Sequence, residues 1–197
     1  MRMIILNHDK KELEKIKLSN DIIISWLVLL SMIVGGIYAY IQYINAKKDK
    51  KIDESLKFIQ KFYEPPVSQY FDNISLMWLA NKKDFWTKME AGKPSTKVTL
   101  TEQKIINEVF DNETLRIIDK SNMRNDLLRM TNFLNMVSIC ANNGICDPQT
   151  IYSFFGKYMC DFIILHRSLI NEMRITYSDN NTAREIDKFL TEYAKNI

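Results

Sequence analysis

Three cysteines and two histidines are the side chains best suited to covalent or metal chemistry in this chain of 197 residues. Cys160 and His166 share an apolar stretch that predicts a helix, but six residues separate them, or about 240° around its axis. A cysteine nucleophile needs its base within hydrogen-bond reach, so these two cannot form a catalytic pair on that helix. Asp161 lies about 140° from His166 and is poorly placed to orient the imidazole. The sequence therefore predicts no catalytic residues and a protein that is not an enzyme.

Cofactor and metal motifs give no stronger signal. The cysteines and histidines are scattered and match no zinc spacing, so we expect no metal site. The pair Gly35-Gly36 lies in an apolar run and does not form the G-x-G-x-x-G loop that holds a dinucleotide. We therefore predict no cofactor and name no cofactor-binding residue. An odd number of cysteines without a C-x-x-C pair predicts reduced thiols that pack as small apolar residues.

Two aromatic pairs, Phe85-Trp86 and Phe154-Phe155, could line a pocket, although aromatic residues at helical spacing more often fill a core. Charge narrows the choice of ligand. Residues 66–197 contain 16 basic and 16 acidic residues, so the net charge of +3 comes from the first 65 residues. A neutral domain lacks the basic face that long nucleic acids require, whereas one small anionic ligand in a local pocket is compatible with this charge.

An uncharged run of 23 residues, 22–44, is long enough to predict a membrane-spanning helix. It exceeds the roughly 20 residues that cross a bilayer as a helix. The apolar core of a signal peptide is shorter and precedes a small-residue cleavage site, which is not found after this run. Trp26 near one end, with Tyr38, Tyr40 and Tyr43 near the other, suits the two lipid headgroup layers. We therefore predict a polar tail at 1–21 and a transmembrane helix at 22–44, with the lipid bilayer as a partner.

Basic residues on the two sides of this run suggest its orientation. Five precede it and six follow within residues 45–65, and the second group is denser at the membrane edge. Because basic residues favour the cytoplasmic side, we expect an inner-membrane protein with a cytoplasmic C-terminal domain. The dense group could instead recruit anionic lipids, at about 1 kcal/mol for each side chain. Its members are Lys47, Lys48, Lys50 and Lys51.

Small residues recur every fourth position inside the run, at Ser31, Gly35 and Ala39. Such a face lets two helix backbones approach closely in lipid, so it predicts packing of this span in a homo-oligomer. The alternative is that Gly35-Gly36 merely makes the helix flexible.

The rest of the chain shows helical periodicity throughout. Residues 45–64 predict a juxtamembrane helix with an apolar face at Ile52, Leu56, Ile59 and Tyr63, ending before the prolines at 65–66. Within the domain 65–197, apolar stripes predict helices at about 67–91, 99–110, 112–142 and 148–177, and a final helix after residue 182. The fold class is thus all-α, with one N-terminal transmembrane helix continuing into an antiparallel cytosolic helical bundle.

One turn is especially well marked, in the segment "NNGICDP" at 142–148. Gly144 suits a helix C-terminus, Asp147 an N-cap and Pro148 a first helical turn. The surrounding segment "FLNMVSICANNGICDPQTIYSFFGKYM", with "FIQKFYEPP" at 58–66, resembles a large uncharacterised bacterial family of small proteins. Members have an N-terminal membrane helix and a helical cytosolic domain of unknown function. Gly144, Asp147 and Gly156 match its pattern, whereas Cys146 and Pro148 depart from it. The resemblance implies no catalytic residues.

We therefore expect a membrane-anchored, non-enzymatic scaffold or sensor that acts through oligomerisation and partner binding. The alternative is a bacterial antiviral-defence effector whose helical domain binds a small cyclic nucleotide and perturbs the membrane. A titration of the cytosolic part with cyclic oligonucleotides that shows no binding would count strongly against the effector.

Overall fold

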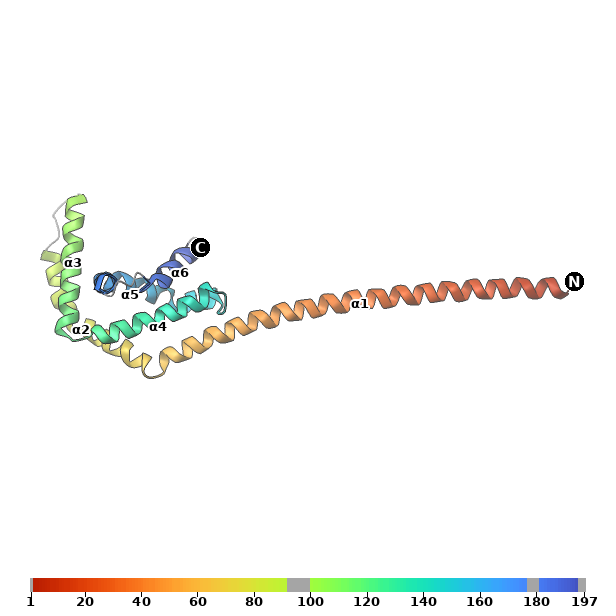
Figure 1. The fold of residues 1–197 in the computed structure, drawn as a ribbon, viewed down its shortest axis with the longest axis horizontal. Coiled ribbons are helices and arrows are strands. Elements are labelled where there is room, and N and C mark those ends of the chain that lie inside the picture. The colour runs from red at the N-terminus through yellow and green to blue at the C-terminus, as the bar shows by residue number, and fades with distance from the viewer. Residues whose placement is uncertain (1, 92–99, 177–180, 195–197) are drawn as a thin grey trace. The chain divides into compact units, whose positions relative to one another are not determined.

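The computed structural model describes residues 2–91, 100–176 and 181–194, and in these ranges every regular element is an α-helix (Figure 1). This confirms the all-α fold class, with a long apolar N-terminal helix followed by a helical domain. The helices are α1 (Arg2–Tyr63), α2 (Val67–Ala91), α3 (Leu100–Lys120), α4 (Arg124–Asn142), α5 (Pro148–Thr176) and α6 (Arg184–Ala194).

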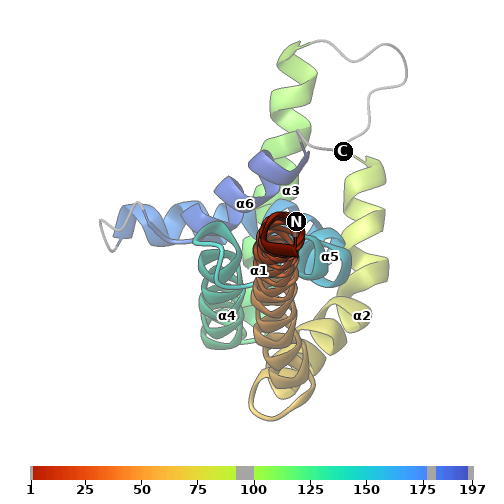
Figure 2. The ribbon, with the colours of Figure 1, turned by 90° about the vertical axis from the view of Figure 1, so that its right-hand side faces the viewer.

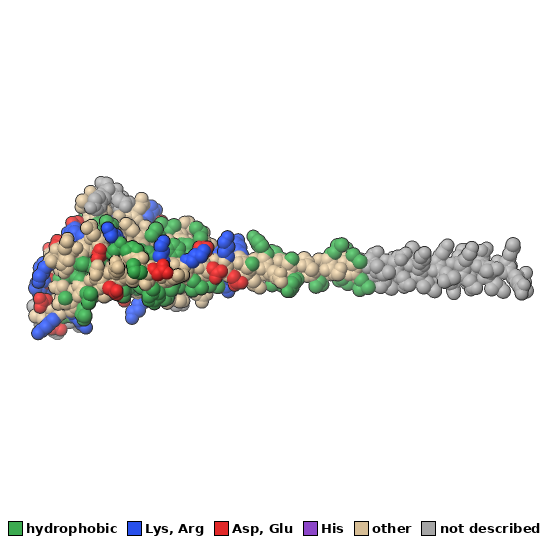
Figure 3. Space-filling view, turned by 90° about the horizontal axis from the view of Figure 1, so that it is seen from below, with side chains coloured by type: hydrophobic (Ala, Val, Ile, Leu, Met, Phe, Trp, Pro, Cys, Tyr) green, Lys and Arg blue, Asp and Glu red, His purple; other side chains and the backbone are tan. Residues whose placement is uncertain are grey.

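The chain divides into two compact units, Met1–Asp49 and Lys50–Ile197, and the division falls inside α1. In the first unit every side chain from Trp26 onward is exposed. Figure 3 shows that hydrophobic and uncharged side chains make up the surface of this stretch before the lysines begin. Its length and apolar composition are sufficient for one helix to cross a membrane.

The second unit has one hydrophobic core. The stripes predicted on α4 and α5 supply much of its centre, including Leu127, Met130, Leu134, Ile151 and Phe155, and Met159 beside them is also fully buried. Around them, α3 contacts α2 and α5, and α6 contacts α4 and α5 (Figure 2). These buried stripes position the remaining faces of α2 and α5, on which the candidate site lies.

The part of α1 that belongs to the second unit uses only part of the predicted face, from which Ile59 packs against the core. Leu56 and Tyr63 are exposed, whereas Ser55 is fully buried and Phe62 packs against the core. The Phe62 ring lies 5.3 Å from that of Phe71 and 5.5 Å from that of Phe155, measured between centroids. An aromatic ring buries more area than a leucine side chain, so the face that carries Phe62 packs against the core.

The predicted helix end near residue 110 is wrong, because α3 continues to Lys120. The chain turns instead at Asn122, whose φ of 54° is left-handed, and the Met123 amide donates to the carbonyl of Ile118 at 3.1 Å. Asparagine tolerates this conformation at a helix C-terminus better than most residues. Residues 92–99, between the helices predicted at about 67–91 and 99–110, lie outside the described residues.

The turn between α4 and α5 confirms the predicted caps. Gly144 has a φ of +65°, and Asp147 Oδ2 accepts a hydrogen bond from the Thr150 amide at 2.8 Å. The prediction of reduced thiols is wrong for two of the three cysteines, since Cys140 and Cys146 form a disulfide. The tight turn brings their Cα atoms to 5.2 Å, within the range a disulfide requires.

Candidate functional site

A cavity in the second unit lies along one face of α2, and Leu165 of α5 flanks it. Trp78, Lys82 and Trp86 are spaced by four residues, so they follow one another along that face. The cavity has a volume of about 350 Å³. Its remaining lining residues are Ser75, Leu79 and Phe85 of α2 and Leu165 of α5. We call it the aromatic cavity.

A buried histidine on α5 fixes one wall of this cavity. His166 is 2% exposed, and its backbone is non-helical, with φ −112° and ψ 16°, which kinks α5 next to Leu165. Trp78 Nε1 donates to His166 Nε2 at 3.1 Å, and His166 Nδ1 donates to the Phe162 carbonyl at 2.9 Å. Both ring nitrogens are therefore occupied when the imidazole is neutral. Burial lowers the pKa of His166 to about 4, so it is neutral near pH 7.

Phe85 holds the two indole rings from the core side. This phenylalanine is 4% exposed, and its ring meets Trp78 edge to face at 5.5 Å and Trp86 at 5.7 Å between centroids. Phe110 of α3 contacts the same ring at 5.5 Å. Because aromatic edges and faces attract one another in these geometries, Phe85 favours this placement of both indole rings.

Lys82 is the one charged side chain among the residues that line the aromatic cavity. It is exposed, and no carboxylate in the described part of the chain lies within ion-pair distance of it. The cavity therefore offers a flat apolar surface and one unneutralised cation. This combination suits binding of an apolar molecule with an acidic group.

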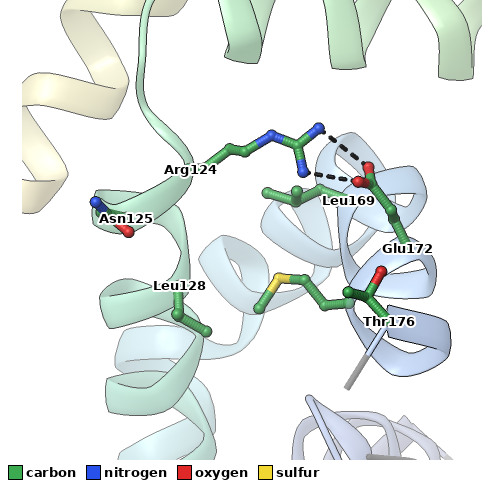
Figure 4. Close-up of a pocket in the computed structure, with 7 residues that line it drawn as sticks. Arg124, Asn125, Leu128, Leu169, Glu172 and Thr176 are labelled. Atoms are coloured by element: carbon green, nitrogen blue, oxygen red, sulfur yellow. Dashed lines mark hydrogen bonds and ion pairs between the residues drawn. The ribbon is translucent and has the colours of Figure 1, made fainter. Parts of the chain in front are cut away.

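A second, smaller cavity of about 160 Å³ lies between α4 and α5 (Figure 4). Arg124 reaches across it to Glu172, with hydrogen bonds of 2.8 and 3.2 Å, and it also pairs with Asp119. The hydrogen bond to Asp119, followed by that to Glu172, raises the pKa of Arg124. Because two carboxylates already neutralise this guanidinium, the second cavity is a poorer site for an anion than the aromatic cavity.

The residues predicted to pack the membrane span lie on α1 within the first unit. The Ser31 hydroxyl donates to the Val28 carbonyl at 2.7 Å, so its polar atom is satisfied within the helix. A Cβ atom added to Gly35 would meet nothing within 4 Å, and Ala39 is exposed.

The predicted membrane-edge lysines divide between two environments. Lys47, Lys48 and Lys50 are exposed. Lys51 is partly buried, and its carbonyl accepts a hydrogen bond from the Asp147 amide at 3.2 Å. Lys51 therefore helps attach α1 to the turn before α5.

Cys160, Asp161 and His166, which the sequence analysis rejected as a catalytic group, lie in different environments. Cys160 is a free, exposed thiol, whereas His166 is buried with both ring nitrogens hydrogen bonded, and Asp161 is exposed. Among the described residues there is no group of three histidine, cysteine or carboxylate side chains able to hold a metal ion.

The sequence favoured a core role for both aromatic pairs and offered a pocket only as the less common alternative. Of the two aromatic pairs considered, Phe85-Trp86 lines it, whereas Phe155 is buried in the core. Lys82 was missed, although its spacing of four from each tryptophan was a readable signal. The Trp78–His166 hydrogen bond joins residues 88 positions apart, and no local pattern could have revealed it.

Comparison with known protein families gives a match over most of the chain. A family model described as "Domain of unknown function (DUF4760)" matches residues 29–193. No curated protein and no solved structure matches the chain.

Proposed function

We propose a function for this chain from one premise: it belongs to the DUF4760 family of domains of unknown function. That function is a membrane-anchored, non-enzymatic scaffold or sensor, which acts by self-association and by binding a partner through its helical domain. The observation that carries the proposal is the exposure of every side chain at positions 26–44, a stretch without charge. Apolar surface of this extent needs a cover, which lipid and a second span supply.

The small-residue face supports self-association of the span. Ser31, Gly35 and Ala39 repeat every four residues, and within the described part of the chain nothing lies within 4 Å of a Cβ atom placed on Gly35. Close backbone contact between two such faces gains dispersion energy that lipid tails do not replace.

Isoleucine at Gly35 tests this proposal, with isoleucine at Gly36 as the matched control. Each substitution adds the same side chain to a helix with open space at that position, but the two lie about 100° apart around the axis. We expect Gly35→Ile to raise the dissociation constant of the oligomer about fivefold, roughly 1 kcal/mol, as measured by energy transfer between labelled chains in bilayers. Equal effects of the two variants, or no effect of either, would refute association through this face.

We further propose a bacterial inner-membrane location with the helical domain in the cytoplasm, supported by the dense lysines at positions 47–51. The Cys140–Cys146 disulfide supports the opposite placement, since disulfides persist in oxidising compartments. The free, exposed thiol of Cys160 separates the two without any substitution. A cytoplasmic domain predicts that a membrane-impermeant maleimide labels spheroplasts only after lysis, with Cys160→Ser as the unlabelled control. Labelling of intact spheroplasts would place the domain outside.

Nucleotide binding by an antiviral effector is the weaker candidate. The cations that line the two described cavities are Lys82 and Arg124, and two carboxylates already pair with Arg124. A cyclic oligonucleotide carries several phosphates and calls for several unpaired donors. Titration of the full chain with cyclic dinucleotides should therefore give no stabilisation, and saturable stabilisation would favour the effector over the scaffold.

A further inference from the structure

Helix α2 exposes large apolar side chains beside the aromatic cavity, with Leu79 at 70% and Trp86 at 51% exposure. We propose that this cavity binds a small organic anion with a flat aromatic body, whose acidic group pairs with Lys82. The inference goes beyond the proposed self-association of α1 and does not rest on it, because the residues involved belong to α2 and α5.

The spacing of the lining residues defines the shape of this ligand. Trp78 and Trp86 lie on the same face of α2, eight residues or about 12 Å apart along the axis, and Lys82 stands midway. A single aromatic ring packed on either indole therefore has its substituent about 6 Å along the helix, within reach of the lysine side chain. A benzoate-sized anion spans that distance, and the cavity volume of about 350 Å³ falls at the small end of ligand sites.

The walls are preorganised, which favours binding of a small molecule. His166 anchors the Trp78 indole through a hydrogen bond, and Phe85 packs edge to face against both tryptophans. A ligand that packs on the Trp78 indole meets a side chain already held in place, which lowers the entropy cost of that contact. Ser75 adds one hydroxyl for a second polar contact.

Charge distinguishes this ligand from other occupants. Lys82 has no ion-pair partner among the described residues, so an acidic group on the ligand would be its first counter-ion. One cation matches one negative charge and not a polyphosphate. An apolar helix of a second copy would cover the same surface but would remove the ammonium group from water without a partner, which is unfavourable.

Tryptophan quenching by a heavy-atom probe tests the proposal on the full chain in lipid nanodiscs. The chain has three tryptophans, and Trp26→Phe leaves only the two of the cavity as reporters. The probes are 4-iodobenzoate, its neutral analogue 4-iodobenzamide and the cation 4-iodobenzylammonium. We expect saturable quenching by the anion, about fivefold weaker binding of the neutral probe and the weakest binding of the cation.

Two lysine variants make the test specific. Lys82→Met should weaken binding of 4-iodobenzoate about fivefold, to the level of the neutral probe, and should leave the binding of that neutral probe unchanged. Lys83→Met is the matched control, since Lys83 is exposed on the same turn but does not line the cavity. Linear quenching that ignores probe charge, or equal losses in both variants, would overturn the proposal. Quenching that Leu79→Arg abolishes only by dissociating an oligomer would identify a second copy as the occupant and also overturn it.

Discussion

Protonation of His166 should destabilise the helical domain at mildly acidic pH. The imidazole is buried and accepts a hydrogen bond from Trp78 at Nε2, so a proton on that atom would break this bond and place a charge in the core. Burial lowers the pKa of His166 from an ordinary value of 6.5 to about 4 in the folded chain. Between these two values the unfolded chain binds a proton that the folded chain does not, so the free energy of unfolding falls as the pH falls.

The expected magnitude follows from the two pKa values. The loss of unfolding free energy is about 2 kcal/mol between about pH 7.5 and about pH 5, and it approaches about 3 kcal/mol near pH 4. Hydrogen bonds from arginine lower the carboxyl pKa of Glu113 and of Asp119, so these two groups titrate mainly below this window. The other histidine of the chain, His8, is far from His166 in the sequence and belongs to the first unit.

Urea denaturation of the full chain in nanodiscs measures this effect through the fluorescence of Trp78, with Trp26 and Trp86 replaced by phenylalanine. The matched control is His166→Gln, whose amide oxygen can accept the same hydrogen bond but does not titrate. We expect the parent to lose about 2 kcal/mol across the window and the glutamine variant to stay flat. Equal pH dependence in the two proteins would refute the assignment of a neutral, buried imidazole.

Two further substitutions test how the helices are joined. Ser55→Ala should lower the unfolding free energy by about 1 kcal/mol and speed hydrogen exchange at the Asp147 amide, because the buried hydroxyl accepts that amide at 2.9 Å. The exposed Ser153 bonds only within its own helix, so Ser153→Ala should be neutral, and a similar loss there would remove the argument. Gly156→Ala would place a Cβ atom 2.8 Å from the Tyr152 ring and should lower the urea midpoint by the equivalent of about 1–2 kcal/mol. That loss should be relieved in a Tyr152→Leu background, and an unrelieved loss would point to another cause.

Local signals accounted for most of the helices. The apolar stripes of α4 and α5 were readable because helical geometry repeats every 3.6 residues whatever the partner. The caps at Gly144 and Asp147 were equally local, since each depends on the conformation of one residue and its next few neighbours. The uncharged run at 22–44 was evident from composition alone.

Faces and turns that depend on competition were predicted less well. On residues 50–63 the predicted face was only partly correct, because Phe58 and Phe62 pack against the core together with Ile59, whereas Leu56 and Tyr63 are exposed. The predicted break near residue 110 is absent, because α3 continues to Lys120 and the chain turns at Asn122.

By itself, the sequence determined that this protein is all-α, where its long apolar helix lies and which side chains of α4 and α5 form the core, because these depend on local periodicity and charge. Only the tertiary structure decided that Cys140 bonds to Cys146 and that His166 anchors Trp78 beside an unpaired Lys82. The physical reason is distance along the chain: the hydrogen bond between Trp78 and His166 joins residues 88 positions apart, and α2 and α5 come near one another only because both pack against α3 and α4.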